Sequence, residues 1–69
     1  MDFYSALRLA VESGVNITRK EWGDAEYYGC IFNGQLMLHK PDGVLYSWII
    51  SDGDIAAQDW MMIGEFVND

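Results

Sequence analysis

Two tight turns in the middle of the chain most constrain its fold. Asn33-Gly34 is the strongest short-range marker of a type I′ hairpin, because both central residues of that turn need a positive φ angle. Pro41-Asp42-Gly43 marks a second tight turn. The segments beside these turns are rich in aromatic and β-branched residues, which is typical of strands. The sequence therefore predicts a three-stranded antiparallel meander over residues 27–32, 35–40 and 44–50.

The hairpin turn also predicts the register of the first two strands, because a two-residue loop leaves its flanking residues opposite each other. The predicted pairs are Phe32–Gln35, Cys30–Met37 and Tyr28–His39. Side chains alternate between the two faces of a strand. Tyr27 and Tyr28 therefore point to opposite faces, and we expect one of them to be available to a ligand or a partner.

Alternation along the third strand predicts what each face of the sheet carries. One face receives Val44, Tyr46, Trp48 and Ile50, and the other receives Leu45, Ser47 and Ile49. Both faces are largely apolar, and one small helix cannot cover both. We therefore expect one face to pack against another subunit.

The N-terminal segment has the pattern of an amphipathic helix. Apolar residues recur at helical spacing over Phe3, Ala6, Leu7, Ala10 and Val11. Asp2 is a favoured residue type for the N-cap, and Gly14 stands where a C-cap glycine is expected. These signals predict a helix over residues 2–13.

Shorter elements follow this helix and the meander. Residues 15–18 alternate between apolar and polar, which predicts a short strand that runs into Trp22. Ser51 and Asp54 resemble a capping box and open a short helix that ends near Gln58. Residues 59–63 are expected to form a final strand, and residues 64–69 a tail.

These elements predict a single α+β domain over residues 1–69. The N-terminal helix packs on a small antiparallel sheet of about four or five strands, with the meander at its centre and a short helix near the C-terminus.

The size of the chain predicts self-association. A chain of 69 residues buries only about 60% of the surface that its unfolded form exposes, yet 51% of these residues are hydrophobic. Cys30 is the only cysteine, so no internal disulfide can form. His39 is the only histidine, which excludes an all-His/Cys zinc site within one chain. We therefore expect a homo-oligomer, either a dimer or a tetramer, and no metal or cofactor.

The charge of the chain excludes two classes of partner. Eleven acidic residues face four basic ones, for a net charge of −7. Duplex nucleic acid and anionic membranes both require a basic surface, which this chain cannot build. A small anionic ligand needs only one or two arginines and backbone N–H groups, so it fits the composition. The N-terminus lacks the basic and apolar regions of a signal peptide, and a free cysteine suits a reducing cytoplasm.

An enzymatic function has little support in the sequence. Cys30 and His39 are the obvious nucleophile and base, but the predicted register pairs them with other residues. Asp52-Gly53-Asp54 lacks the remaining spacing of a calcium loop. We therefore expect a protein that is not an enzyme.

Trp22 has two interpretations. It follows Arg19-Lys20-Glu21 in a polar stretch, so it either anchors the core at the end of a strand or offers a stacking surface for a base or sugar. In the second case Arg19 lies nearby for a phosphate. Trp48 and Trp60 are expected in the core or in an interface.

The order of several motifs resembles a known family. Ile17-Thr18-Arg19, followed by Trp22, is similar to a "V-T-R-x-x-W" strand after an N-terminal helix and a glycine. The segment from Trp48 to Trp60, with Ser51, Asp54 and Asp59 at their spacings, is similar to a "W-x-x-S-x-x-D-L-x-A-x-D-W" ending. Both belong to the phage-encoded Thoeris anti-defence family of the second type. The segment between Trp22 and Trp48 is shorter here than is usual in that family.

The resemblance implies an oligomeric α+β protein in the cytoplasm of the host bacterium that sequesters a cyclic nucleotide immune messenger without cleaving it. The messenger is either a cyclic ADP-ribose isomer or a cyclic oligonucleotide. The residues implied in binding are Thr18, Arg19, Trp22, Trp48, Ser51 and Asp54. The alternative is a small acidic protein that inhibits a host enzyme through an apolar face of its sheet.

Overall fold

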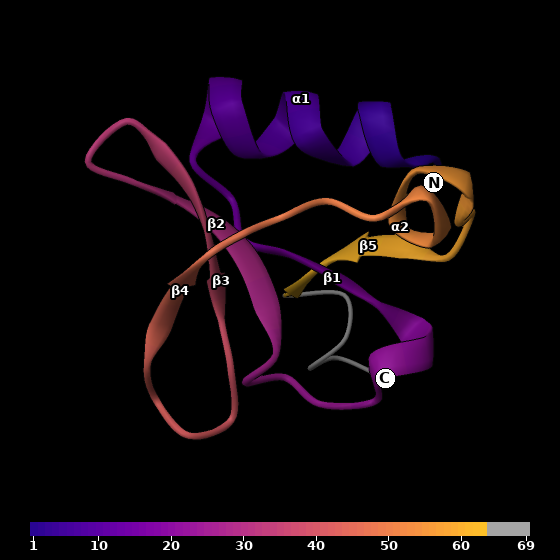
Figure 1. The fold of residues 1–69 in the computed structure, drawn as a ribbon. Coiled ribbons are helices and arrows are strands. Elements are labelled where there is room, and N and C mark those ends of the chain that lie inside the picture. The colour runs from indigo at the N-terminus through magenta and orange to yellow at the C-terminus, as the bar shows by residue number, and fades with distance from the viewer. Residues whose placement is uncertain (64–69) are drawn as a thin grey trace.

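A computed structural model describes residues 1–63 of the chain (Figure 1). The elements, in chain order, are α1 (Phe3–Ser13), β1 (Ile17–Arg19), the single 3-10 turn η1 (Lys20–Trp22), β2 (Tyr28–Phe32), β3 (Gln35–His39), β4 (Leu45–Ser47), α2 (Asp52–Ala56) and β5 (Trp60–Met62). The predicted α+β fold is confirmed. The tail predicted at residues 64–69 lies outside the described residues.

Local signals place the ends of α1 as predicted. The Asp2 carboxylate accepts a hydrogen bond from the N–H of Ser5 (3.1 Å), which satisfies one of the free donors of the first turn. Gly14 adopts a left-handed conformation (φ 69°), and its N–H donates to Ala10 O (3.1 Å). Both caps depend on residues at most four positions apart, so the sequence alone could identify them.

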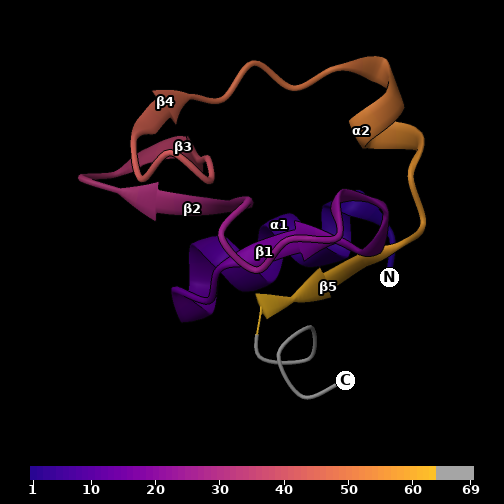
Figure 2. The ribbon, with the colours of Figure 1, turned by 90° about the horizontal axis from the view of Figure 1, so that it is seen from below.

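The five strands form one antiparallel sheet in the order β4-β3-β2-β1-β5 (Figure 2). Asn33 and Gly34 both have positive φ angles, as a type I′ turn requires. The predicted register of the hairpin is confirmed, with Phe32 opposite Gln35, Cys30 opposite Met37 and Tyr28 opposite His39. β5 pairs with β1 and occupies the edge far from the meander.

The prediction of a third strand over 44–50 is wrong in length, because β4 ends at Ser47. Ser47 pairs with Met37, so β3 has only two residues left before the hairpin turn. Trp48 makes one last bond, from its N–H to Leu36 O (3.4 Å), and the chain then leaves the sheet toward α2. The strand predicted at 15–18 starts later, at Ile17, and the last strand covers only Trp60–Met62.

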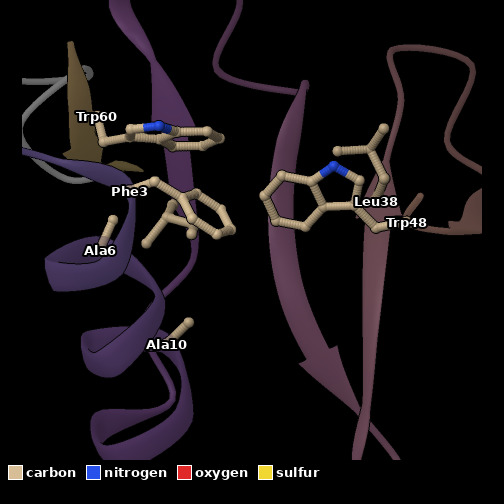
Figure 3. Packing of buried hydrophobic residues seen from close by; sticks show 7 residues of the cluster. Phe3, Ala6, Ala10, Leu38, Trp48 and Trp60 are labelled. Atoms are coloured by element: carbon tan, nitrogen blue, oxygen red, sulfur yellow. The ribbon is translucent and has the colours of Figure 1, made fainter. Parts of the chain in front are cut away.

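The core lies between α1 and one face of the sheet. α1 packs mainly against β1, β2, β5 and α2. The buried apolar residues are Phe3, Ala6, Ala10, Ile17, Leu38, Trp48 and Trp60 (Figure 3). The Phe3 ring centroid lies 5.9 Å from that of Trp48 and 5.3 Å from that of Trp60. Trp48 thus extends the core from the helix toward the β3–β4 end of the sheet.

Neither helix described in residues 1–63 has the length and apolar content needed to cross a bilayer.

Candidate functional site

A hollow of about 390 Å³ opens over the β3–β4 end of the sheet, on the face that carries α1. Leu38 and Tyr46 are opposite each other on neighbouring strands and contribute to its wall. The full lining is Trp22, Tyr27, Leu38, Lys40, Tyr46, Ser47, Trp48, Ile49, Ser51 and Asp54. Its volume lies within the range of about 300 to 1,000 Å³ that is common for small-molecule sites.

Aromatic rings form much of this wall. The Trp22 ring lies 4.4 Å from that of Tyr27, with an interplanar angle of 33°. It also contacts Trp48 (6.4 Å) and meets Trp60 edge-on (5.3 Å, 82°). Trp22 is half-buried, so it is both the core anchor and the exposed aromatic surface that the sequence offered as alternatives. It packs against the core on one side and lines the hollow on another.

Local backbone geometry places Trp22 and Tyr27 together. Trp22 ends η1 rather than a strand, because Gly23 (φ 63°) reverses the chain directly after it. The N–H of Tyr27 then donates to Asp24 O (3.1 Å), which closes the turn that leads into β2. The two rings therefore face each other across one short loop. Tyr28 points the other way and stacks on His39 (4.5 Å, 8°), as alternation predicts.

Gly29 lies directly against the ring of Trp48, which lines the hollow. A Cβ at Gly29 would lie 2.2 Å from the nearest carbon of the Trp48 ring, so no other residue fits without moving the indole. Gly29 was not among the site residues predicted from the sequence. The available signal was a glycine inside a strand, which often marks the close approach of another group.

Arg19 does not line the hollow, because acidic groups of its own chain surround it. Its Nε lies 2.9 Å from Asp59 Oδ1, and its Nη2 lies 3.0 Å from Glu21 Oε2. Its Nη1 lies 3.9 Å from Asp54 Oδ1. The side chain is only 15% exposed. The guanidinium therefore joins β1, η1, α2 and the segment before β5.

This ion-pair network shifts the pKa values of Arg19 and Asp59. Burial acts to lower the pKa of Arg19, but the hydrogen bond and charge of Asp59 outweigh it and raise the pKa. Burial acts to raise the pKa of Asp59, but hydrogen bonds from Arg19 and from the N–H of Glu21 (2.9 Å) hold it below its ordinary value. Both groups are charged in the folded protein at neutral pH.

The other predicted polar residues also take part in structural hydrogen bonds. Thr18 is fully buried, does not line the hollow, and donates from Oγ1 to Tyr27 O (2.6 Å). Ser51 and Asp54 do line it, and the predicted capping box is confirmed. The N–H of Ser51 donates to Asp54 Oδ2 (3.2 Å), and the N–H of Asp54 donates to Ser51 Oγ (3.2 Å). Of the six predicted site residues, Trp22, Trp48, Ser51 and Asp54 line the hollow, and Thr18 and Arg19 support it from outside.

Cys30 and His39 lie on neighbouring strands but are not partners, since Cys30 is opposite Met37. Burial raises the pKa of the Cys30 thiol, which lowers its reactivity. The ring Nδ1 of His39 lies 2.6 Å from Glu26 O. Within residues 1–63, no three His, Cys, Asp or Glu side chains gather closely enough to hold a metal ion.

Comparison with known proteins identifies the family to which this chain belongs. A model of the Tad2-like family, described as the Thoeris anti-defense 2-like domain, matches residues 1–63. Searches among curated proteins and among solved structures found no significant match. The match covers every element described above and supports a role in phage anti-defence. The chain therefore belongs to the Thoeris anti-defense 2-like domain family.

Proposed function

We propose that this protein binds a cyclic nucleotide immune messenger in the hollow beside Trp22 and sequesters it, without cleaving it, in the cytoplasm of the host bacterium. The observation that supports this most is the aromatic wall of Trp22, Tyr27 and Trp48 in a domain of an anti-defence family. The messenger is a cyclic ADP-ribose isomer or a cyclic oligonucleotide, as the motif resemblance implies.

Stacking would supply much of the binding energy. Every nucleobase has a flat π-face, and its stacking on an aromatic side chain contributes about 1 to 3 kcal/mol. The Trp22–Tyr27 pair is held by the turn at Asp24 and by the bond from Thr18 to Tyr27 O, so little conformational entropy is lost on binding. A protein that removes a scarce messenger must bind it with nanomolar affinity, which corresponds to about −12 kcal/mol.

A homo-oligomer is part of this proposal. Ile49 lines the hollow and is 89% exposed, so it belongs to its rim, and Tyr46 in the same lining is 38% exposed. A second subunit packed on this rim would bury apolar surface and enclose the ligand at the same time. The native mass of the purified protein, with and without ligand, tests this part.

The groups around the hollow favour capture over cleavage. Among the described lining residues, Asp54 is the one carboxylate, and it already accepts a bond from the N–H of Ser51 and lies near Arg19. The Ser51 hydroxyl accepts a hydrogen bond from the N–H of Asp54 and has no histidine beside it in the lining. The described lining of the hollow thus offers no histidine and no unpaired carboxylate as a general base.

Calorimetry with cyclic ADP-ribose isomers, cyclic dinucleotides and cyclic trinucleotides tests the proposal. We expect one class to bind tightly, and Trp22→Leu to weaken that binding at least about tenfold through lost stacking. Tyr4→Leu is the matched control, because Tyr4 is 64% exposed on α1 and does not line the hollow. Bound ligand released by heat should elute unchanged in chromatography. Failure to bind any of the panel would overturn the proposal, and so would a cleaved product.

Inhibition of a host enzyme through the sheet is a second candidate function. Phe32, which is 52% exposed, lies on the sheet face opposite α1, together with half-buried Cys30 and Met37. Under this alternative, Phe32→Ser would abolish protection of phage in cells that carry the defence system. Under the messenger proposal, Phe32→Ser keeps ligand affinity, and Trp22→Leu is the change that abolishes protection.

A further inference from the structure

We infer that Lys40, rather than Arg19, meets the negatively charged group of the ligand in the hollow. This inference depends on the proposed function, because it assigns the charge selectivity of the same site. The motif resemblance implied that Arg19 takes part in ligand binding, because an arginine near a stacking tryptophan can bind a phosphate. The structure gives the two cations very different surroundings.

The charge of Arg19 is already matched within the protein. Carboxylates of Asp59 and Glu21 lie 2.9 and 3.0 Å from its guanidinium, and that of Asp54 lies at 3.9 Å. An incoming phosphate would meet this acidic group of residues and would have to displace Asp59, which holds η1 through the N–H of Glu21. Binding there would cost the protein a charge-assisted hydrogen bond for each one gained.

Lys40 lies on the wall of the hollow and is the only basic residue among the described residues that line it. Within residues 1–63, Lys40 has no carboxylate at ion-pair distance. The remaining cations lie elsewhere, since Arg8 pairs with Glu12 on α1 and Lys20 belongs to η1 outside the hollow. The Asp42 carboxylate acts on Lys40 only at longer range than an ion pair. In a chain of net charge −7, a cation without an ion pair at a hollow favours the binding of an anion there.

The β3–β4 turn holds Lys40 in this position. The N–H of Gly43 donates to Lys40 O (2.9 Å), and the N–H of Lys40 donates to Val44 O (3.2 Å). Its Nζ lies 4.4 Å from the centroid of the Tyr46 ring, at a distance suited to a cation–π interaction. The Tyr46 hydroxyl donates to Asp42 Oδ2 (2.5 Å), which fixes the ring.

Asp42 fixes that ring without an ion pair to the ammonium group. Its two oxygens accept hydrogen bonds from Tyr46 and from the N–H of Val44 (2.9 Å). The ammonium group thus stands at the same hollow as the stacking wall of Trp22 and Tyr27. This arrangement suits a ligand with a flat base and a nearby phosphate, the chemistry that cyclic nucleotides share.

Calorimetry of the full chain with cyclic ADP-ribose and with cyclic di-GMP, at low and at high salt, tests the inference. For the probe that binds, we expect Lys40→Met to weaken affinity about tenfold or more, as for the loss of a charged hydrogen bond. The salt dependence of binding should become flatter than in the wild type. Lys40→Arg should restore most of the affinity. Lys20→Met removes the same charge outside the hollow and is the matched control.

Melting curves and native mass show whether each variant keeps the fold, and Lys40→Gln is a second neutral replacement. If Lys40→Met and Lys40→Gln bind as the wild type does, while Trp22→Leu does not bind, the inference is wrong and the proposed function stands. If the wild type binds neither these two probes nor any other member of the panel of cyclic ADP-ribose isomers, cyclic dinucleotides and cyclic trinucleotides, the proposed function fails and the inference fails with it.

Discussion

The two ends of one sheet face differ in what covers them. At the β5–β1–β2 end, the 11-residue helix α1 covers the strands, and Phe3, Ile17 and Trp60 are at most 2% exposed. At the β3–β4 end, the cover is Trp48 and the chain segment that leads to α2, and the hollow lies there. The covered end supplies the buried core, and the open end leaves the hollow in which the proposed ligand would bind. A chain this small has room for both because α1 covers only part of the sheet.

A chain of aromatic rings connects the two ends. Trp60 contacts Phe3, Trp22 and Trp48, so the wall of the hollow rests directly on the core. Substitutions at the covered end should therefore reduce stability most, and those toward the open end should change stability less and binding more.

Trp60→Ala should have the largest effect on stability. Loss of a buried Trp costs about 3 to 5 kcal/mol, and the Asp54 carbonyl would also lose its hydrogen bond from Trp60 Nε1 (2.9 Å). We expect a largely unfolded chain by far-ultraviolet circular dichroism and urea titration. Trp60→Phe keeps apolar bulk and should lose less. A cooperative fold in Trp60→Ala, with near wild-type stability, would show that the core does not depend on the covered end.

Asp59→Asn should come next, because it removes the charge that binds Arg19 at the junction of the two ends. A hydrogen bond to a charged group is worth about 1.5 to 3 kcal/mol, and both side chains are partly shielded from solvent. We expect the free energy of unfolding, measured by urea titration at neutral pH, to fall by about this amount. Glu21→Gln, at an exposed position, should cost much less.

The same variant tests the response to acid. The folded-state pKa of Asp59 lies below its unfolded value of about 3.9, so the folded state binds protons less readily. Its contribution to stability is complete above that unfolded pKa and disappears as the pH falls through the folded pKa. The free energy of unfolding of Asp59→Asn should consequently fall less steeply than that of the wild type below about pH 4. If the free energies of unfolding of the variant and the wild type fall in parallel as the pH decreases, the ion pair does not contribute to stability.

Gly29→Ala should lower stability by about 1 to 3 kcal/mol, because the new methyl group would overlap the Trp48 ring. Unlike the changes above, it acts at the wall of the hollow and should also shift the near-ultraviolet circular dichroism of the tryptophans. Gly53→Ala is a suitable control, since its added Cβ would meet only an ordinary contact at 3.7 Å. Equal effects of the two changes would exclude a close approach of Trp48 to Gly29.

Ser51→Ala should have the smallest effect, about 1 kcal/mol, because it removes only the N-cap of the five-residue helix α2. Ser51→Asp keeps an acceptor at the cap and should retain most of the stability. Thermal melts of both variants measure the difference. A loss as large as that of Trp60→Ala would mean that the open end carries much of the stability.

The sequence by itself determined the features that depend on neighbouring residues. These are the caps of α1 at Asp2 and Gly14, the capping box of α2, and the register around Asn33-Gly34. Each is set by a turn or hydrogen bond that spans a few residues, so the residue types reveal it. The motif resemblance also implied that Trp22 and Trp48, which line the hollow, take part in binding.

Only the tertiary structure decided the rest, because it depends on contacts between distant segments. β4 ends early because the chain leaves the sheet after Trp48 and leads to α2, and Gly29 is needed because the Trp48 ring packs against it. Arg19 is withdrawn from the hollow by Asp59, 40 residues along the chain. Local patterns identified a cation near a tryptophan, but the packing of carboxylates around Arg19 left Lys40 as the basic residue that lines the hollow.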